Sequence, residues 1–374
     1  MGKGLNGCMK RVYIYAYTEV NLGDDLFIHQ LIRRYPGTQF IMIANQQYKS
    51  MMRPYKNVLI HDKYSILAKV LQKLGIYGLW ERKVIAACDY AVYIGGSVFM
   101  EYERWKEQYL WYQNLFDNSK LFFIGCNWGP YKNESFYLKM KSVLGKMKDV
   151  CFRDRKSYNL FSDLSNVRYA PDILFGTKFP DIEKHNQIFI SVIDCSSKEE
   201  GGITLKEYEC NYLENLKKII LFYSSKGFEI KLVSFCEKEN DSLAICHIKD
   251  LLDCEEKTKI SELVYDGNNL NYILAEMKAS KLIIGSRFHA VILGMVANIP
   301  VIPFVYSDKT INVLEDMDYQ GMYIDIRQSD NIDMKNLEDS LNAWKTPDLL
   351  SDWIEESNRH FHVLDTVLKT NRRD

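Results

Sequence analysis

Residues 281–309, KLIIGSRFHAVILGMVANIPVIPFVYSDK, decide the fold class of this chain. The apolar run from Lys281 to Ile284 predicts a β-strand, because short apolar runs that end at a glycine are typical of buried strands. A helix rich in small apolar residues should follow from Arg287 to Ala297, and a second strand from Val301 to Tyr306. Strand, helix and strand in this order predict a parallel β-α-β unit.

Several polar side chains of this unit fall where an anion would bind. Ser286 can cap the helix, and Arg287, His289 and Lys309 would stand at strand ends beside a helix N-terminus. Unpaired N–H groups and the helix dipole favour negative charge there. Because open α/β sheets bind ligands at the carboxyl ends of their strands, we prefer a site for a phosphate ester. The alternative is an ordinary buried unit whose charges are incidental.

Strand-like and helix-like runs alternate through both halves of the chain. RVYIYAY at 11–17 and QIFISVI at 187–193 each begin such a series, and the polar stretch KFPDIEKHN at 178–186 is the expected linker. The pattern predicts an α/β fold of two Rossmann-like domains, each with a mostly parallel sheet covered on both faces and with a cleft between the domains. The expected boundaries are 1–180 for the first domain, 187–345 for the second, and 346–374 for a C-terminal helix that packs back across the domains.

Composition narrows the function classes. A chain of 374 residues with 47% hydrophobic and 26% charged residues is typical of a globular protein, and a net charge of −1 gives no support to nucleic-acid binding. Nine cysteines without metal-ligand spacing indicate reduced thiols in the cytoplasm and no metal site. His360 and His362 form an HxH pair in a polar stretch, which we interpret as surface residues. The stretch MGKGLNGCMK has no apolar core region, so we expect no signal peptide. The sequence contains no apolar run of about 18 residues, so no transmembrane helix is predicted.

The order of several motifs resembles the polysaccharide pyruvyl transferase family. SRFHA with the apolar helix after it, IPVIPFVY and then Lys309 carry the first part of the resemblance. The resemblance runs from Tyr13 to Asp325, and it is specific through the order and spacing of its motifs rather than through any one of them. The other motifs are NLGDDLFIHQLI (21–32), YIGGSVF (93–99) and CFRDRKSYNLF (151–161), with looser fits in GCNWGP (125–130) and YAPDILF (169–175).

The resemblance implies both a fold and a reaction. The fold would be like that of GT-B glycosyltransferases. The reaction would transfer the pyruvyl unit of phosphoenolpyruvate to two hydroxyls of a sugar, forming a cyclic ketal and releasing phosphate. The acceptor would be a cell-surface polysaccharide, such as a capsule or exopolysaccharide, or its lipid-linked precursor. Phosphoenolpyruvate would be a co-substrate, so no cofactor is expected, and the expected location is the cytoplasm.

Two further motifs supply candidate residues in the first half of the chain. Gly23 permits a tight turn, one of Asp24 and Asp25 should cap the helix that follows, and the other can act as a base. The resemblance favours Asp24, rather than Asp25, as the aspartate with the functional role. Adjacent glycines at Gly95 and Gly96 let a backbone approach a ligand closely, although the pair can also be a simple turn. Ser97 stands where the family tends to have more glycine.

Arg153 follows an apolar strand and matches the family motif. The match implies that its guanidinium enters the cleft, where a planar fork suits a carboxylate or phosphate. The alternative is a surface ion pair with Asp154. The candidate catalytic residues are therefore His289, Arg153 and Asp24, and the candidate substrate-binding residues are Arg287, Lys309, Ser286, Asn21, Gly95, Gly96, Ser97 and Asn127.

Two stretches allow more than one interpretation. KYSILAKVLQKLGIYGLWERK at 63–83 combines an apolar face with basic residues. That pattern suits an anionic membrane surface about as well as it suits a helix that packs on its domain. EYERWKEQYLWYQ at 101–113 can stack sugar rings, but core packing is the favoured interpretation.

Two rival functions share the predicted fold. A glycosyltransferase that uses a nucleotide sugar would have the same two domains and a similar anion site. Thermal stabilisation by phosphoenolpyruvate but not by nucleotide sugars would distinguish the pyruvyl transferase from it. A non-catalytic glycan-binding protein is the second rival, and it would keep its biological function in a His289→Ala variant without any turnover.

Overall fold

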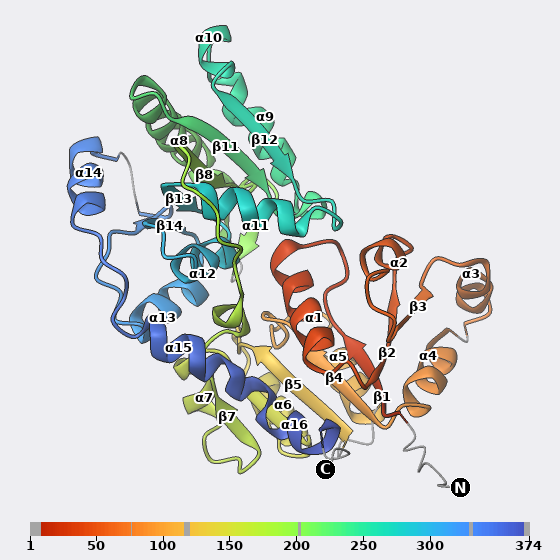
Figure 1. Ribbon diagram of the computed structural model, residues 1–374. Coiled ribbons are helices and arrows are strands. Elements are labelled where there is room, and N and C mark those ends of the chain that lie inside the picture. Colours follow the sequence, from red (N-terminus) through yellow and green to blue (C-terminus); the bar gives the residue numbers. More distant parts are fainter. Residues whose placement is uncertain (1–8, 76, 116–119, 201–202, 329–331, 370–374) are drawn as a thin grey trace, which may run out of the picture. The chain divides into compact units, whose positions relative to one another are not determined.

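The computed structural model describes the chain as two compact α/β units (Figure 1). Each unit is built on its own parallel sheet, as the sequence predicts. The described residues are 9–75, 77–115, 120–200, 203–328 and 332–369. Unit 1 holds the described parts of residues 1–18, 24–173 and 358–374, and unit 2 holds those of residues 19–23 and 174–357.

The sheet of unit 1 has seven parallel strands in the order β3-β2-β1-β4-β5-β6-β7. All six residues of β5, LFFIGC, are buried, because helices cover both faces of a parallel sheet. The strands are β1 (Arg11–Tyr15), β2 (Gln39–Ala44), β3 (Val58–Asp62), β4 (Tyr90–Ile94), β5 (Leu121–Cys126), β6 (Asp149–Phe152) and β7 (Val167–Tyr169).

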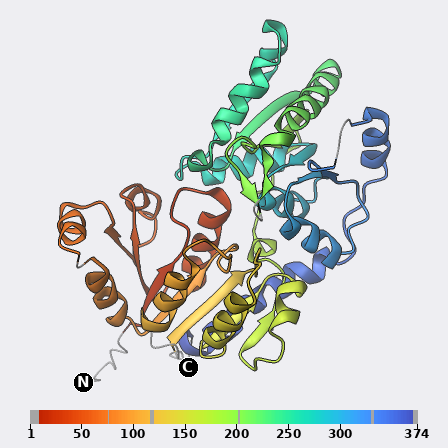
Figure 2. The ribbon, with the colours of Figure 1, turned by 180° about the vertical axis from the view of Figure 1, so that it is seen from behind.

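Helices cover both faces of this sheet. α5 and α6 pack together on one face (Figure 2), and α1 and α16 cover the other. Trp105 and Tyr112 of α5 are buried in an aromatic-rich core, so these two members of the 101–113 stretch are packing residues. The helices are α1 (Leu22–Arg34), α2 (Gln47–Met51), α3 (Ile66–Lys73), α4 (Tyr77–Ala86), α5 (Trp105–Leu115), α6 (Glu134–Leu144), α7 (Arg155–Leu160) and α16 (His362–Leu368).

Unit 2 has a six-stranded parallel sheet in the order β12-β11-β8-β13-β14-β15. The stretch 281–309 forms β13, α12 and β14 as predicted, and all five residues of β14 are buried. The strands are β8 (Gln187–Ser191), β11 (Glu229–Ser234), β12 (Ile260–Val264), β13 (Leu282–Gly285), β14 (Val301–Val305) and β15 (Ile324–Asp325), and β9 (Glu199–Glu200) and β10 (Ile203–Thr204) form a separate antiparallel pair.

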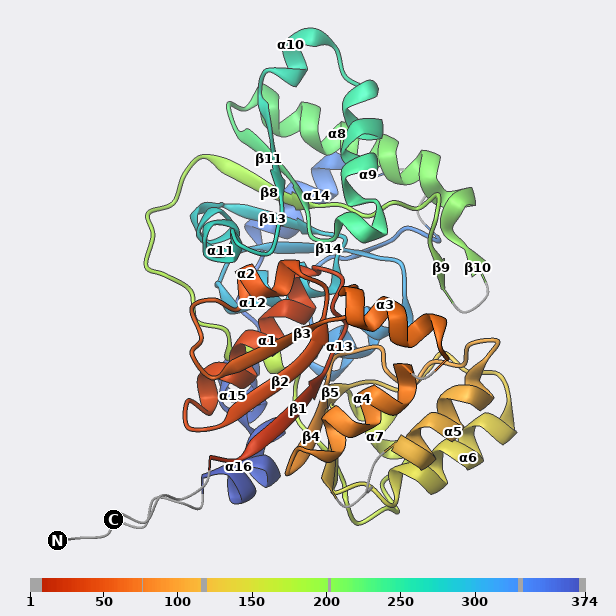
Figure 3. The same cartoon turned by 90° about the vertical axis from the view of Figure 1, so that its right-hand side faces the viewer.

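Two layers of helices enclose the sheet of unit 2. α8 packs with α9 and α14 on one face, while α11 and α12 lie on the other (Figure 3). α13 and α15 follow the last strands of the series. The helices are α8 (Glu209–Ser225), α9 (Asp241–Asp250), α10 (Cys254–Lys257), α11 (Leu270–Ala279), α12 (Phe288–Val296), α13 (Asp308–Asp316), α14 (Met334–Asn342) and α15 (Leu350–Glu356).

Each sheet has one point where its strand order reverses. In unit 1 the point lies between β1 and β4, and in unit 2 it lies between β8 and β13. Ligands of open α/β sheets bind outside the carboxyl ends of the strands at such a point. The loops that follow these four strands therefore mark the candidate site of each unit.

The boundary between the first and the second unit lies at a different place from the one that the sequence predicts. Unit 1 ends at Ile173 rather than at residue 180, and residues 19–23 belong to unit 2. Residues 19–23 belong to unit 2 because the backbone bonds there: Leu22 N donates to the carbonyl of Phe235 at 3.1 Å. Leu22 and Gly23, the first two residues of α1, thus belong to unit 2, although the rest of the helix belongs to unit 1.

The C-terminal segment is shared between the two units. The ring of Trp353 in α15 packs edge-on against Phe175, at 5.1 Å between ring centroids, within unit 2. Residues from 358 onward belong to unit 1, where Asp365 of α16 pairs with Arg34 at 2.6 Å. The predicted single helix over 346–374 is two short helices joined by a 3-10 turn at Ser357–Phe361.

His360 corrects one prediction from the sequence. We interpreted His360 and His362 as surface residues, but His360 is fully buried and only His362 is exposed. His360 Nε2 donates to the carbonyl of Pro171 at 2.8 Å, and its Nδ1 accepts from Gly125 N at 3.3 Å. The neutral imidazole therefore has a structural role. The polar residues around it in the sequence did not indicate that it is buried.

Two features bear on redox state and membrane insertion. The eight cysteines that lie in the described residues are free thiols, and five of them are buried. Across those same residues, no helix combines the length and the apolar character that crossing a bilayer requires.

We expect the protein to lose stability as the pH falls below about 6.5. Burial, with help from Arg168, lowers the pKa of His360 to about 3, and burial lowers the pKa of His29 to about 4, from an ordinary value of 6.5. Between these values the unfolded chain binds more protons than the folded chain, so falling pH favours unfolding by up to about 1.4 kcal/mol per pH unit and group. Urea unfolding at pH 7.5, 6.5, 5.5 and 4.5 measures the slope.

A His360→Gln variant should show a shallower slope than the wild type below pH 6.5, because one of the two titrating groups is gone. The exposed His362→Gln variant serves as the control. Equal slopes for the His360→Gln variant and the wild type would contradict the assignment.

Candidate functional site

Residues 19–23 bring the first motif, NLGDD, into unit 2. Val20 adopts φ 55°, a left-handed conformation that costs a β-branched residue about 1–3 kcal/mol. Asn21 follows, and its Oδ1 accepts a hydrogen bond from Gly23 N at 3.1 Å, while its Nδ2 donates to Glu239 Oε1 at 3.4 Å. The predicted aspartate cap is therefore wrong, because Asn21 occupies the capping position before α1.

Gly23 lies directly against the ring of His289. A methyl group added at Gly23 would be 1.6 Å from His289 Nδ1, far inside contact distance. His289 is half-buried in the first turn of α12, beside the ring of Phe288. Two motifs that lie more than 260 residues apart, NLGDD and SRFHA, thus meet within unit 2.

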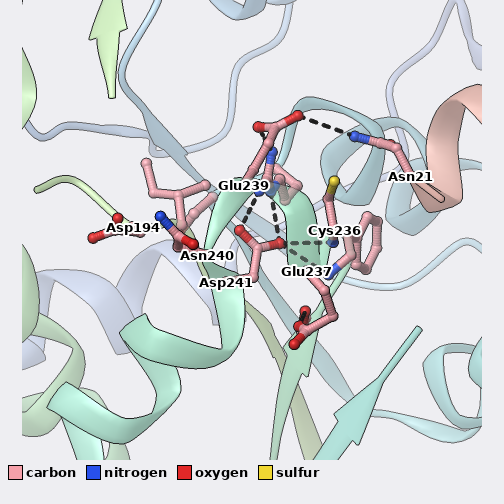
Figure 4. A network of polar contacts seen from close by, with 12 residues as sticks. Asn21, Asp194, Cys236, Glu237, Glu239, Asn240 and Asp241 are labelled. Atoms are coloured by element: carbon pink, nitrogen blue, oxygen red, sulfur yellow. Dashed lines mark hydrogen bonds and ion pairs between the residues drawn. The ribbon is translucent and has the colours of Figure 1, made fainter. Parts of the chain in front are cut away.

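Arg287 is the centre of a buried ion network, whose carboxylates Glu239 and Asp241 are drawn in Figure 4. Arg287 is 6% exposed, and its Nε donates to Asp241 Oδ2 at 2.9 Å. Its two Nη atoms bind Asp241 Oδ1 and Glu239 Oε2, and Glu239 also pairs with Lys198. Burial alone would raise the pKa of Glu239, but Arg287 and Lys198 together lower it well below its ordinary value.

Just before α12, several of the polar groups that the sequence singled out are paired with other groups of the protein. Ser286 does not cap the helix, since Arg287 holds the capping position and Ser286 Oγ shares a 2.9 Å hydrogen bond with Tyr212 Oη. The backbone N–H groups of Ser286 and Arg287 both donate to Ser191 Oγ, at 3.1 and 3.2 Å. A buried guanidinium requires carboxylate partners, so the fork of Arg287 faces Asp241 and Glu239.

Lys309 and Tyr306 extend the network at the carboxyl end of β14. The Nζ atoms of Lys309 and Lys198 each lie 5.6 Å from the ring centroid of Tyr306. Burial alone would raise the pKa of Tyr306, but Lys309, Lys198 and Arg287 lower it below its ordinary value. Lys309 is half-buried and has no salt bridge among the described residues.

Ser307 adds a polar group beside this pair. Ser307 precedes α13 directly and is fully buried. Its Oγ has no hydrogen-bond partner within the described parts of the chain, and it does not cap the helix. The start of α13 therefore combines an unpaired hydroxyl, a lysine and the positive end of a helix dipole.

The aspartates of NLGDD have different environments. Asp25 is fully buried and accepts a hydrogen bond from Tyr48 Oη, so it is a structural residue. Asp24 is half-buried in unit 1, and its Oδ1 lies 3.8 Å from the position of a methyl group added at Gly95. The ends of β1 and β4 thus come together as the strand order requires, while Ser97 is exposed to solvent.

Arg153 centres a second buried cluster, which lies in unit 1. It is 3% exposed, Nη1 pairs with Asp172 Oδ2 at 2.9 Å, and Nη2 donates to Asn127 Oδ1 at 2.7 Å. A methyl group added at Gly96 would lie 2.5 Å from Nη2, so the guanidinium packs against the backbone of the GG turn. Asn127 N in turn donates to the carbonyl of Gly96 at 2.9 Å.

This environment corrects the sequence interpretation of Arg153. We expected its guanidinium to face a cleft or to pair with Asp154, but Asp154 instead caps α7 through Ser157 N. Because Arg153 and Asp172 are both buried, removing either one leaves an unpaired charge at a cost of about 3–5 kcal/mol. Arg153 holds the Gly96 turn in place, so its truncation would change the fold of this loop as well as any binding.

The carboxylates of both clusters form ion pairs with cationic side chains of the protein itself. Glu239 and Asp241 bind Arg287, and Asp172 binds Arg153. No group of three or more His, Cys, Asp or Glu side chains is positioned for a metal ion, as far as the described ranges extend.

The sequence analysis missed several members of the two clusters. Asp172 lies within the motif YAPDILF, from which no candidate site residue was predicted. Lys198 has a signal in the sequence, because it follows the strand 187–193 closely. The remaining members are Tyr306, Ser307, Glu239 and Asp241, and the last two lie in a polar CEKEND stretch that looks like an ordinary surface loop.

A family model described as polysaccharide pyruvyl transferase matches residues 21–308, which include the networks around Arg287 and Arg153. The chain belongs to the polysaccharide pyruvyl transferase family. The amylovoran biosynthesis protein AmsJ of Erwinia amylovora is 20% identical over 263 residues. The match covers 64% of this chain and 62% of that relative, so the chain spans less than two thirds of the relative's length.

Solved structures resemble this pyruvyl transferase family member in fold. A protein named as a putative UDP-N-acetylglucosamine 2-epimerase, from Listeria monocytogenes, has a TM-score of 0.59 at 12% identity, with 98% of each chain covered. The UDP-GlcNAc 2-epimerase of Methanocaldococcus jannaschii has a TM-score of 0.56 at 13% identity, with 96% of this chain and 100% of that chain covered. These likenesses support the GT-B-like fold class that the sequence predicts.

We expect Gly23→Ala to destabilise the protein by about 1–3 kcal/mol, because the new methyl group overpacks against His289. Gly78→Ala is a matched control, since Gly78 is also the second residue of its helix and has open space around it. That change should be neutral or stabilise by up to about 1 kcal/mol. Urea unfolding measures both.

The double variant Gly23→Ala/His289→Ala tests the contact directly. Removing the imidazole should restore part of the stability that Gly23→Ala loses. Equal stability of Gly23→Ala and Gly78→Ala would show that the two motifs are not in contact.

Proposed function

We propose that this protein transfers the pyruvyl unit of phosphoenolpyruvate to two hydroxyls of a sugar, forming a cyclic ketal and releasing phosphate. Family membership supports pyruvyl transfer in polysaccharide biosynthesis. The observation that carries the proposal is the contact between Gly23 of NLGDD and His289 of SRFHA, because it gathers two family motifs at one place in unit 2. The acceptor is a cell-surface polysaccharide, such as a capsule or exopolysaccharide, or its lipid-linked precursor.

The reaction needs an acid, a base and a site for the leaving phosphate. A proton adds to C3 of the enol as C2 gains cationic character, and an acceptor hydroxyl then bonds to C2. The second hydroxyl bonds to C2 as the C2–O bond to phosphate breaks, so the two hydroxyl protons balance the proton taken by C3 and the one carried off by phosphate. His289 is the proposed acid or phosphate-activating group, and Asp24 is the proposed base.

We place the phosphate group at the start of α13. The fork of Arg287 is bound to two carboxylates, whereas Lys309 has no salt bridge among the described residues. The unpaired hydroxyl of Ser307 and the helix dipole add to the attraction for an anion. Lys198 and Lys309 both lie beside the ring of Tyr306, and their charges lower the pKa of this phenol.

The other cationic and polar candidates hold loops in place, each within its own unit. Arg287 fixes the loops that carry Glu239 and Lys198, and Arg153 with Asn127 fixes the Gly95–Gly96 turn. Phosphoenolpyruvate is a co-substrate in this scheme, and none of its steps calls for a resident cofactor. We propose that the reaction takes place in the cytoplasm.

Product formation tests the proposal. Purified protein incubated with phosphoenolpyruvate and candidate sugars, both lipid-linked and free, should yield by mass spectrometry a product that carries one pyruvyl ketal. The His289→Ala variant should form it at least about 100-fold more slowly, as expected when an acid is removed. Thermal stabilisation by nucleotide sugars but not by phosphoenolpyruvate would overturn the proposal in favour of a glycosyltransferase. Intact biological function of His289→Ala without turnover would favour a glycan-binding role.

We expect Lys309→Ala to weaken phosphoenolpyruvate binding by about 10- to 100-fold, because a charge-assisted hydrogen bond contributes about 1.5–3 kcal/mol. Stability should change little, since Lys309 pairs with no carboxylate among the described residues. Isothermal titration calorimetry measures the affinity, and Lys335→Ala on exposed α14 is the control. Unchanged affinity in Lys309→Ala would move the phosphate away from α13.

A further inference from the structure

The helix α3 presents apolar side chains to solvent. Ile66 is 84% exposed, Leu67 57%, Val70 46% and Leu74 64%, and Ala68 is the only buried residue of the helix. Leu79 of α4 and Tyr64 before α3 add exposures of 57% and 56%. We call this set of six exposed side chains the α3–α4 face: Tyr64, Ile66, Leu67, Val70, Leu74 and Leu79.

The spacing of these residues makes the surface continuous. Ile66, Val70 and Leu74 follow one another at intervals of four, so they form one stripe along the helix, and Leu67 widens it. Ala68 points to the opposite side, toward the body of unit 1. The helix is therefore anchored by its small residue and exposes its large ones, the reverse of an ordinary packed helix.

Basic residues border this apolar stripe. Residues 63–86 contain five basic side chains and one acidic one, for a local charge of +4 in a chain whose net charge is −1. Lys69 and Lys73, four residues apart on α3, lie along one edge of the stripe, and both are exposed. Arg82 and Lys83 are exposed on α4. An apolar stripe with lysines along its edge is typical of helices that lie in the plane of a membrane surface.

We propose that the α3–α4 face binds the surface of a membrane rich in anionic lipid, with Ile66, Val70 and Leu74 inserted among the acyl chains at the headgroup boundary. Lys69 and Lys73 then contact lipid phosphates. The sequence alone left this surface as either a packed helix or a membrane contact, and the exposure of its apolar side chains favours the second. The proposal does not rest on the enzymatic activity.

Charge argues against a second copy of the chain as the occupant. A symmetric dimer would bring the same patch of both copies together, and each patch carries +4. Six side chains are also few compared with the 20–30 residues that each partner of a stable interface contributes. An anionic lipid surface satisfies the apolar stripe and the positive charge at once.

Vesicle co-sedimentation of the purified full-length chain tests the proposal. We expect the protein to sediment with phosphatidylcholine vesicles that contain about 30% phosphatidylglycerol, and to bind pure phosphatidylcholine vesicles about tenfold or more weakly. Raising the salt from about 0.1 M to about 0.5 M should release much of it, because salt screens exposed charges. The variant Ile66→Ser/Val70→Ser/Leu74→Ser should bind anionic vesicles at least about tenfold more weakly than the wild type.

The matched control removes three exposed leucines elsewhere, Leu110→Ser/Leu138→Ser/Leu243→Ser, whose exposures are 52%, 56% and 44%. This variant should bind vesicles like the wild type, and both variants should keep the wild-type unfolding midpoint. Equal binding to neutral and anionic vesicles, or wild-type binding by the α3 variant, would overturn the proposal. A wild-type dimer that the α3 variant abolishes, without vesicle binding, would assign the face to a second copy and equally overturn it.

Discussion

The burial of Arg287 determines how the loops around it in unit 2 are arranged. A guanidinium that is 6% exposed must be paired, because an unpaired buried charge costs several kcal/mol. The partners, Asp241 and Glu239, come from the loop after β11, and Lys198 joins from the loop after β8. One ion network therefore fixes the loops that follow three of the strands at the point where the strand order reverses.

The same constraint gives the cationic side chains different roles. Arg287 and Arg153 are bound by carboxylates and act by holding loops in place, whereas Lys309 stands at the start of α13 beside an unpaired serine hydroxyl. A fixed fork surrounded by carboxylates suits a structural role, because its donors are already satisfied. A half-buried lysine that forms no salt bridge with the described residues suits a ligand that arrives and leaves. We therefore propose that a phosphate ester is attracted to the start of α13, and not to the start of α12 that the sequence favoured.

Segment 19–23 links the motifs of the two halves of the chain. Val20 takes a strained conformation, Asn21 bonds to Glu239, and Gly23 makes room for the ring of His289. Strain of this kind persists only where the surroundings over-determine it, and it tends to gather at functional sites. The glycine of NLGDD thus has a packing role that its position in a turn did not suggest. The imidazole, not the turn, excludes a side chain there.

The sequence by itself determined the fold class, because buried parallel strands leave apolar runs such as 281–284 and 301–306 that alternate with helical patterns. It also placed Arg287 at the end of a strand, and β13 ends two residues before it. Only the tertiary structure decided the partners of the charged groups, because Asp172, Glu239 and Asp241 reach their arginines from distant stretches of chain. The same holds for His360, which is buried by a fold that brings residue 125 beside it, and for α3, whose apolar side is exposed. Periodicity shows which residues share a face of a helix, but what that face meets depends on the rest of the chain.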